Sequence, residues 1–208
     1  MNTQTFWLER TDQVAVGLRR YARGSGLTCE EGYHSALVYT GMEPAEYGPD
    51  GYLAPRPMAE DSRWPTRCER CDGELPEDSV RLMWQEQVYR RTDNGELRVL
   101  HPSAPAPAAP SAEPGACWDG WWLPDCYRGP DGIALVVRCP DGQDWLVDVR
   151  ASNCTRRDDD THACWERHGD PRECTLTVDK NGDTCSAGAG SIATPNWHGF
   201  FRNGRLEP

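Results

Sequence analysis

The sequence has no long apolar run and no concentration of positive charge. No window approaches the roughly 18 apolar residues of a membrane span, so we expect no membrane-spanning helix. Lysine and arginine total 22 against 33 aspartate and glutamate, which gives a net charge of −11. The basic residues occur at most in pairs, such as Arg19-Arg20 and Arg156-Arg157. A field of this sign repels phosphate backbones, and we therefore expect no nucleic-acid partner.

The first residues also lack the features of a secretory signal. Residues 1–12 include Glu9, Arg10 and Asp12 and have no basic leader followed by an apolar stretch. We therefore expect a cytoplasmic protein, in a compartment that keeps thiols reduced. In such a compartment ten cysteines are better explained by metal thiolates than by disulfides.

Apolar residues are in short supply as well. They make up 38 % of the 208 residues, while 20 glycines and 17 prolines indicate frequent turns. We expect something besides core burial to help hold the fold together. The Pro/Ala-rich segment 102–115 is typical of an extended spacer, because it offers few backbone donors and no apolar periodicity. It separates a β-rich N-terminal lobe, residues 1–101, from a β-rich C-terminal lobe, residues 116–208.

Alternating apolar residues and turn signals predict a mainly β fold built from hairpins. One strand covers Val80 to Val88, and the Asp-Asn-Gly turn that follows returns the chain through residues 96–100. Further strands are expected over 133–138 and 145–149, which flank a Pro-Asp-Gly turn, and over 174–178 and 197–201.

One short helix is predicted over residues 161–167. Asp158 or Asp159 can cap it, and Gly169 before Pro171 can end it. The expected fold class is therefore mainly β with one or two short helices, a β-rich α+β arrangement of hairpin-built lobes that zinc holds together.

The clearest chemical motif is Cys68-Glu-Arg-Cys71-Asp-Gly, a CxxC on a tight turn. Such a knuckle points backbone amides at both sulfurs and places two thiolates on one tetrahedral zinc. Two more ligands are needed, and Cys29 with His34 are the best upstream pair. A redox-active CxxC is the alternative, but the βαβ pattern that accompanies such motifs is not visible here.

A second cysteine/histidine group lies in the last third of the chain. Its candidate ligands are Cys154, Cys164, Cys185 and His198. If they converge on one ion, the chain holds one or two zinc ions in all. On the predicted helix His168 shares a face with Cys164 and is an alternative ligand, whereas His162 faces elsewhere. In the competing interpretation these cysteines are small buried hydrophobes. Cys117, Cys126, Cys139 and Cys174 lack convincing partners and are expected to be packing residues or minor alternative ligands.

Several segments of the C-terminal lobe resemble a family of uncharacterised proteins common in actinobacterial phages and prophages. They are Arg150 to Thr155, His162-Ala-Cys-Trp165, Val178 to Ile192 and Trp197 to Gly204. The resemblance implies a phage-borne protein of the cytoplasm or the virion, and it implies no activity.

The pattern at residues 198–204, with the preceding cysteines, is also similar to zinc-binding domains encoded beside bacterial ubiquitin-like conjugation genes, for which a peptidase role has been suggested. This chain reads Cys139-Pro-Asp-Gly-Gln143 where those domains have Cys-Pro-Cys-Gly-Cys.

Two functions are compatible with these residues. The first is a zinc-stabilised module that binds a protein partner or belongs to the virion, since four protein ligands leave zinc no open position for water. The alternative is a peptidase-like zinc hydrolase whose C-terminal metal keeps three ligands and an activated water, with Glu166, Asp179 or Asp183 as the base. HExxH is absent and thiolates make zinc a poorer Lewis acid, so the module is favoured. A third option is a cysteine nucleophile, drawn from Cys154 and Cys164 with His198 or His168 as its activator.

Overall fold

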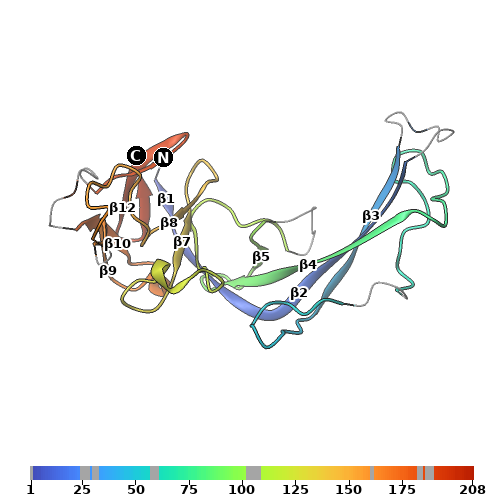
Figure 1. Cartoon of the computed structure of the whole chain (residues 1–208), viewed down its shortest axis with the longest axis horizontal. Coiled ribbons are helices and arrows are strands. Elements are labelled where there is room, and N and C mark those ends of the chain that lie inside the picture. Colours follow the sequence, from blue (N-terminus) through green and yellow to red (C-terminus); the bar gives the residue numbers. More distant parts are fainter. Residues whose placement is uncertain are drawn as a thin grey trace. The chain divides into compact units, whose positions relative to one another are not determined.

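The computed structural model describes residues 2–23, 29, 33–56, 61–101, 109–159, 162–181, 185 and 190–208. The elements are β1 (Thr3–Gln4), β2 (Phe6–Arg23), β3 (Tyr33–Pro44), β4 (Val80–Arg91), β5 (Leu97–Val99), β6 (Ala116–Asp119), η1 (Asp125–Tyr127), β7 (Leu135–Arg138), β8 (Asp144–Leu146), β9 (Trp165–His168), η2 (Pro171–Glu173), β10 (Thr177–Lys180), β11 (Ile192–Thr194), β12 (Trp197–Arg202) and β13 (Arg205–Glu207), as Figure 1 shows. The prediction of a mainly β fold is confirmed. Helical structure in the described residues is limited to the short 3₁₀ helices η1 and η2, and no helix there is long and apolar enough to cross a membrane.

The chain forms two compact units, each assembled from separated pieces of sequence. Unit 1 contains Met1–Glu9, Arg90–Glu96 and Ala112–Pro208, and unit 2 contains Arg10–Tyr89 and Leu97–Ser111. Strands β2 and β4 each have residues in both units. Of the predicted spacer, residues 102–108 lie outside the described residues.

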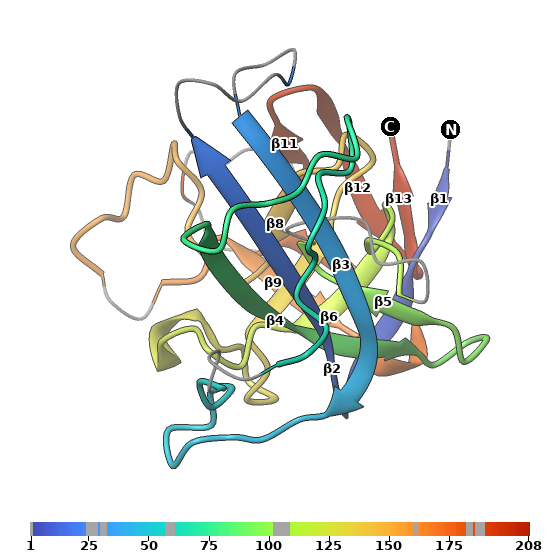
Figure 2. The ribbon, with the colours of Figure 1, turned by 90° about the vertical axis from the view of Figure 1, so that its right-hand side faces the viewer.

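Unit 2 is built on β2 and β3, which form a long antiparallel pair with β4 on the other side of β2 (Figure 2). Strand β2 was not predicted from the sequence. Residues 14–18 of this strand are all buried, so its apolar residues do not alternate with polar ones. One buried cluster is Val14, Val16, Leu18 and Trp64, and the other is Ala15, Val88, Val99 and Ala109. The predicted hairpin after Val80 is confirmed as β4 and β5.

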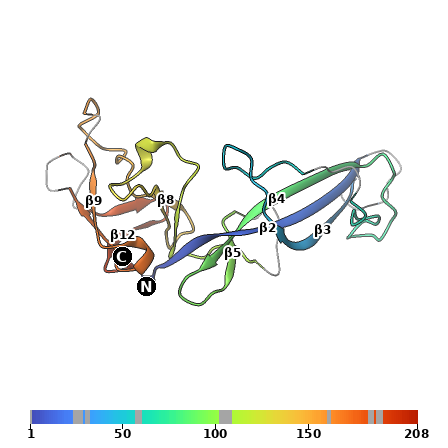
Figure 3. The same ribbon diagram turned by 90° about the horizontal axis from the view of Figure 1, so that it is seen from below.

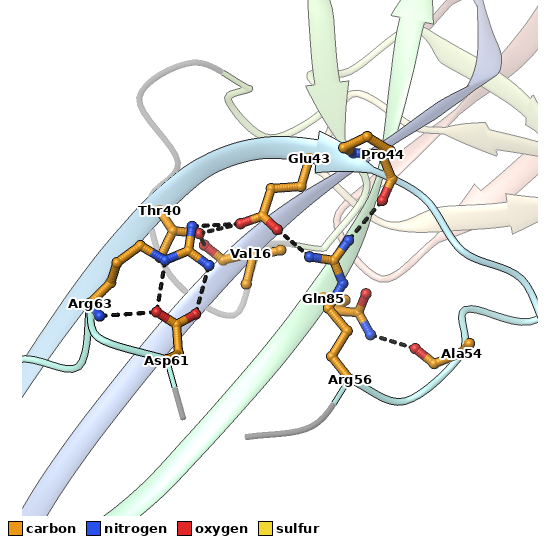
Figure 4. A network of polar contacts seen from close by, with 9 residues as sticks. All are labelled: Val16, Thr40, Glu43, Pro44, Ala54, Arg56, Asp61, Arg63 and Gln85. Atoms are coloured by element: carbon orange, nitrogen blue, oxygen red, sulfur yellow. Dashed lines mark hydrogen bonds and ion pairs between the residues drawn. The ribbon is translucent and has the colours of Figure 1, made fainter. Parts of the chain in front are cut away.

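Ion pairs hold the loop after β3 against this sheet (Figure 4). Arg56 and Arg63 both bind the Glu43 carboxylate, and Arg63 also pairs with Asp61 at 2.6 Å. The Thr40 hydroxyl donates to Glu43 at 2.9 Å. Burial alone would raise the pKa of Glu43, but the hydrogen bonds from these three partners lower it.

Gly17 makes room for an indole ring between these strands. The register of β2 and β3 shifts between Val16 and Gly17, and a Cβ at Gly17 would lie 2.2 Å from Cζ2 of Trp84 on β4. Trp84 also packs edge-on against Tyr39, the residue opposite Gly17, with 6.2 Å between ring centroids. A side chain at this position would therefore displace the indole.

We predict that Gly17→Ala lowers the free energy of unfolding of unit 2 by about 1–3 kcal/mol, because overpacking forces the Trp84 ring out of its site. Denaturant unfolding followed by tryptophan fluorescence measures the change. The control is the same substitution in a Trp84→Leu chain, where the clash is absent and the added loss should be small. Equal losses in the two backgrounds would contradict the assigned clash.

Unit 1 contains two groups of strands. In one the order is β1-β13-β12-β10-β9 with β11 on β12, and in the other the start of β2 runs parallel to β6 and leads to β7 and β8. Because β1 pairs with β13, the two chain ends lie side by side (Figure 3). The core comprises Trp7, Cys117, Ile133, Leu135, Val137, Cys139, Val147, Leu176, Val178, Ile192, Phe201 and Leu206.

The helix predicted over residues 161–167 is wrong, because the chain there is extended and ends in β9. Antiparallel pairing with β10 leaves Trp165 and Arg167 partly buried, whereas Glu166 and His168 are exposed. Pro171, which was expected to follow the helix, instead begins η2. The Asp170 carboxylate accepts from the backbone N–H of Arg172 at 2.8 Å and starts η2, whose first residue is Pro171.

A buried arginine ties β9 to two loops of unit 1. The Arg167 side chain is only 6 % exposed and lies 3.0 Å from Asp148 and 2.7 Å from Asp131. It fills the space beside Gly129, where a Cβ would lie 1.6 Å from Nη2. Burial raises the pKa of Asp148 to about 6, although Arg167 acts in the opposite direction.

This raised pKa predicts a loss of stability as pH rises. Between the usual aspartate pKa of about 3.9 and the folded value, the folded chain holds a proton that the unfolded chain has released. Relative to Asp148→Asn, the wild type should lose about 1–2 kcal/mol of unfolding free energy from about pH 4 to pH 7. Denaturant titrations at several pH values test this. Asp125→Asn is the control, because the Asp125 side chain is fully exposed. The difference in unfolding free energy between this variant and the wild type should not change with pH. If the difference for Asp148→Asn does not change with pH either, the expectation is refuted.

Candidate metal-binding sites

Three of the four donors predicted in the N-terminal lobe form one group in unit 2, and the fourth, His34, lies beside one of them. The sulfurs of Cys29, Cys68 and Cys71 are all within 4.8 Å of one another, and the Sγ atoms of Cys29 and Cys68 are 4.0 Å apart. The Nδ1 atom of His34 lies 3.4 Å from Cys71 Sγ. His34 is 4 % exposed and Cys68 is 2 % exposed, so most of this group is shielded from water.

The CxxC segment forms the tight turn that its sequence predicts. The backbone N–H of Cys68 donates to Gly73 at 2.8 Å, and that of Asp72 returns to the Cys68 carbonyl at 3.0 Å. Asp72 adopts the left-handed conformation with φ of 55°. The N–H of Glu69 donates to the Ser35 carbonyl on β3 at 3.0 Å, which places the turn beside His34.

Backbone amides stabilise one sulfur of this group as a thiolate. Burial by itself would raise the pKa of Cys68, but hydrogen bonds from the backbone of Arg70, Cys71 and Ser35 lower it to about 6. The pKa of Cys29 is raised, first by burial and then by the neighbouring Cys68 and Cys71. Since the thiolate is the form that binds metal, the turn prepares Cys68 for a cation.

A second donor group lies in unit 1. Its members are Cys154, His162, Cys164 and Cys185, whose ligand atoms all lie within 4.8 Å of one another. The Sγ of Cys164 is 3.7 Å from Cys185 Sγ and 3.8 Å from His162 Nε2. Cys154 and Cys164 are each 4 % exposed.

Hydrogen bonds from two other segments of unit 1 hold Cys164 in place. The backbone N–H of Ala151 donates to Cys164 Sγ at 3.3 Å. Asn181, at the end of β10, donates through its backbone N–H to the Cys164 carbonyl and through its side chain to the Ala163 carbonyl. Burial, together with the adjacent thiols of Cys154 and Cys185, raises the pKa of Cys164 to about 12 despite the Ala151 bond. Cys164 therefore resists ionisation unless a cation offsets the charge of its thiolate.

The spacing of the donors fits a tetrahedral metal. With zinc–sulfur bonds of about 2.3 Å and zinc–nitrogen bonds of about 2.0 Å, tetrahedral angles put two sulfurs about 3.8 Å apart and a sulfur and a nitrogen about 3.6 Å apart. The sulfur–sulfur distances here are 4.0 and 3.7 Å, and the sulfur–nitrogen distances are 3.4 and 3.8 Å. All ten cysteines are free thiols. Either group could hold a metal ion.

His162 takes the place that the sequence interpretation assigned to His198. His198 lies on β12 opposite Ala193 and lines a surface cavity instead. The predicted helix had turned His162 away from Cys164, but residues 162–164 are not helical, and the His162 Nε2 atom lies 3.8 Å from Cys164 Sγ. The His-x-Cys spacing is therefore the signal that could have identified His162.

The remaining candidate residues lie outside both groups. Glu166 and Asp179 are exposed and face each other across β9 and β10. His168, the alternative ligand, is 3.9 Å from the Asp179 carboxylate. Asp183 lies outside the described residues. No described carboxylate joins either donor group. Cys117 and Cys139 pack in the unit 1 core, where burial raises the pKa of both thiols, and Cys174 packs against that core. The packing role expected of Cys126 is wrong, because this residue is exposed.

An arginine that the sequence interpretation did not single out accompanies the unit 2 group. Arg20 is 6 % exposed and shares a face of the sheet with His34, because the register pairs Arg20 with Ala36 and Ala22 with His34. Its guanidinium donates to the carbonyls of Pro65 at 3.4 Å and Pro76 at 2.5 Å, on either side of the CxxC turn. Among the described residues no carboxylate pairs with it.

Arg150 is placed in the same way beside the unit 1 group. Its guanidinium donates to the backbone carbonyls of Arg156 at 3.0 Å and Arg157 at 2.9 Å, and also to that of Asp159. These carbonyls belong to the loop between Cys154 and His162. The described part of the chain provides no carboxylate partner for this guanidinium either. Each donor group thus has a nearby positive charge that only carbonyls bind.

We predict that Arg20→Met weakens metal binding in unit 2, because it removes the clamp on the CxxC turn and the charge that offsets the thiolates. Mutation of residues that support the ligands without binding the metal commonly lowers metal affinity by about 10–100-fold, and we expect a loss of Zn²⁺ affinity in this range. Competition with a zinc-binding dye measures the affinity, and amide shifts of residues 68–73 assign it to this group.

Arg19→Met is the matched control for this change. Arg19 is the neighbouring residue of β2; it is exposed, and its Nε atom donates to the Ser35 hydroxyl at 3.4 Å. The same substitution there should leave the zinc affinity within about twofold of the wild type, well short of the loss expected of a group behind the ligands. If the two substitutions change the zinc affinity equally, Arg20 has no specific role in supporting the metal site.

Comparison with known proteins finds no matching family model, no matching curated protein and no matching solved structure.

Proposed function

We propose that this chain is a zinc-stabilised, phage-type accessory protein that acts as a protein-interaction or virion-associated module. The observation that carries the proposal is the convergence of two separate groups of donors. One is Cys154, His162, Cys164 and Cys185. The other is Cys29, Cys68 and Cys71, with His34 of β3 3.4 Å from Cys71 Sγ. Cysteine with histidine is the donor chemistry that zinc prefers. In this proposal each unit holds one structural zinc. The phage assignment rests on the resemblance of the C-terminal segments.

The donor sets favour a structural role for the metal over a catalytic one. Three thiolates and one imidazole saturate a tetrahedral zinc and leave no position for a water. The nearest acidic candidates on β9 and β10, Glu166 and Asp179, are exposed and stand outside the donor group. A hydrolase would need both an open position and a base at the metal.

Charge balance also supports zinc in these groups. A zinc ion with three thiolates and a neutral imidazole carries a net charge of −1. Arg20 and Arg150 each bring a positive charge to the loops that carry the donors, without a carboxylate partner among the described residues. Buried charges are stable when they are paired, so a negatively charged metal site accounts for the buried Arg20. Arg150 is half-buried, and its charge lies beside the loop of the second group.

We expect two zinc ions per chain by native mass spectrometry, and unfolding of the loops when a strong chelator removes them, because metal binding and folding are coupled in such sites. Circular dichroism and amide NMR spectra recorded alongside measure the loss of structure. A metal-free chain with unchanged spectra would show that the cysteines are packing residues and would refute the proposal.

The histidine assignment gives a sharper test within one unit. His162→Ala should leave one zinc per chain at a chelator concentration where the wild type keeps two, because three thiolates hold the ion less tightly than four ligands. His198→Ala is the matched control and should keep both ions. The opposite pattern would return the ligand role to His198, and loss of neither ion would remove both histidines from metal binding.

A further inference from the structure

A surface cavity of about 570 Å³ lies beside the metal-binding loop of unit 1. The loop residues Ala151 to Asn153 form part of its wall, and β8, β9 and the β11–β12 hairpin supply the rest. Its volume is within the range of about 300–1,000 Å³ that ligand pockets have. The proposed zinc site would therefore fix one wall of the cavity.

Three of the strands around the cavity are at edges. Among the described strands β8 pairs only with β7, β9 only with β10, and β11 only with β12. An edge strand leaves one row of backbone N–H and C=O groups available to another chain. The cavity therefore combines a concave surface with backbone groups that can bind an extended segment.

The register shows which backbone groups of β8 face outward. The N–H of Val147 donates to the Leu135 carbonyl at 3.0 Å, which makes these two residues a hydrogen-bonded pair. Hydrogen-bonded and non-hydrogen-bonded pairs alternate along an antiparallel ladder. Leu146, which lies opposite Val136, therefore directs its N–H and C=O away from β7 and toward the open edge.

The side chains that line the cavity favour an uncharged, apolar ligand group. Trp145 and Trp165 form an edge-to-face pair with 5.3 Å between ring centroids, and Leu146 and Val149 extend the apolar surface. The charged groups of the lining already have partners. Asp144 binds Arg138 at 2.8 Å.

The other charged group, Arg150, donates to the carbonyls of its own loop. A strongly ionic ligand would have to compete with these internal contacts, whereas an apolar side chain would not.

From this geometry we infer that the cavity binds an extended peptide segment of a partner protein. The segment adds alongside β8, exchanges backbone hydrogen bonds with Leu146, and places one apolar side chain against Trp145 and Trp165. This mode of recognition takes affinity from the main chain and specificity from the side-chain pocket. The inference rests on the proposed function, because it gives the zinc-stabilised module its binding surface.

The test uses the full zinc-loaded chain and four hexapeptides with blocked termini, which alternate threonine with leucine, phenylalanine, tyrosine or tryptophan. We expect saturable binding of at least one peptide, with shifts of the Leu146 amide and the Trp145 indole resonances. Two copies of that peptide, N-methylated at odd or at even residues, then test strand addition. Because only one edge of an added strand faces β8, one copy should bind at least about tenfold more weakly and the other should bind normally.

A substitution that narrows the cavity provides a second readout. Ala193 is exposed and lines the cavity, and Ala193→Trp should weaken peptide binding at least about tenfold. Glu173→Trp, at an exposed residue of η2 outside the cavity, is the matched control and should leave binding unchanged.

The inference is overturned if none of the four peptides binds, or if both N-methylated copies bind equally well. It is also overturned if an N-acetylglucosamine trimer, added as a carbohydrate probe, binds and no peptide does. Zinc content measured in the same samples separates this result from the proposed function: a chain that keeps two zinc ions but binds no peptide refutes only the peptide site.

Discussion

Placing several thiolates in a buried space is unfavourable unless a cation offsets their charge, and each unit of this chain gathers three cysteines in one place. In unit 1 the neighbouring Cys154 and Cys185, added to burial, raise the pKa of Cys164 to about 12. In unit 2 the backbone amides of the CxxC turn lower the pKa of Cys68 to about 6, while that of Cys29 is raised. A metal ion that binds the thiolates reverses this cost, because it supplies positive charge where the sulfurs meet.

The donor groups lie where the apolar core is thin. The main cluster of unit 1 gathers residues of β6, β7, β10, β12 and β13, whereas the loop between Cys154 and His162 adds only a small cluster of its own. Backbone carbonyls of this loop bind Arg150, and those beside the CxxC turn bind Arg20. Such loops have few apolar contacts. A bound metal, together with an arginine that donates to the loop carbonyls, can stabilise the loop in place of those contacts. Under the proposed function, the same loop then forms a rigid wall for a binding surface.

The sequence was most informative where a local motif decides the structure. Turn residues predicted the β4–β5 and β7–β8 hairpins, because Gly95 and Gly142 adopt the positive φ that their turns require. It was least informative for β2, whose burial on both faces removes the alternation that marks a strand. The helix expected over 161–167 fails for a related reason. A segment this short has little helical stability of its own, and pairing with β10 decides its conformation.

The composition and spacing of the chain by themselves determined that it is mainly β, acidic and rich in cysteine, with several cysteines near turns, because these properties depend on residue type and short-range geometry. The knuckle at Cys68 and Cys71 and its partners Cys29 and His34 follow from such spacing. Only the tertiary structure decided that His162 and not His198 joins Cys154, Cys164 and Cys185. The same holds for the arginines at each group and for the edge strands around the cavity. These arrangements depend on which distant segments pair, and pairing is set by the packing of the whole unit rather than by any local pattern.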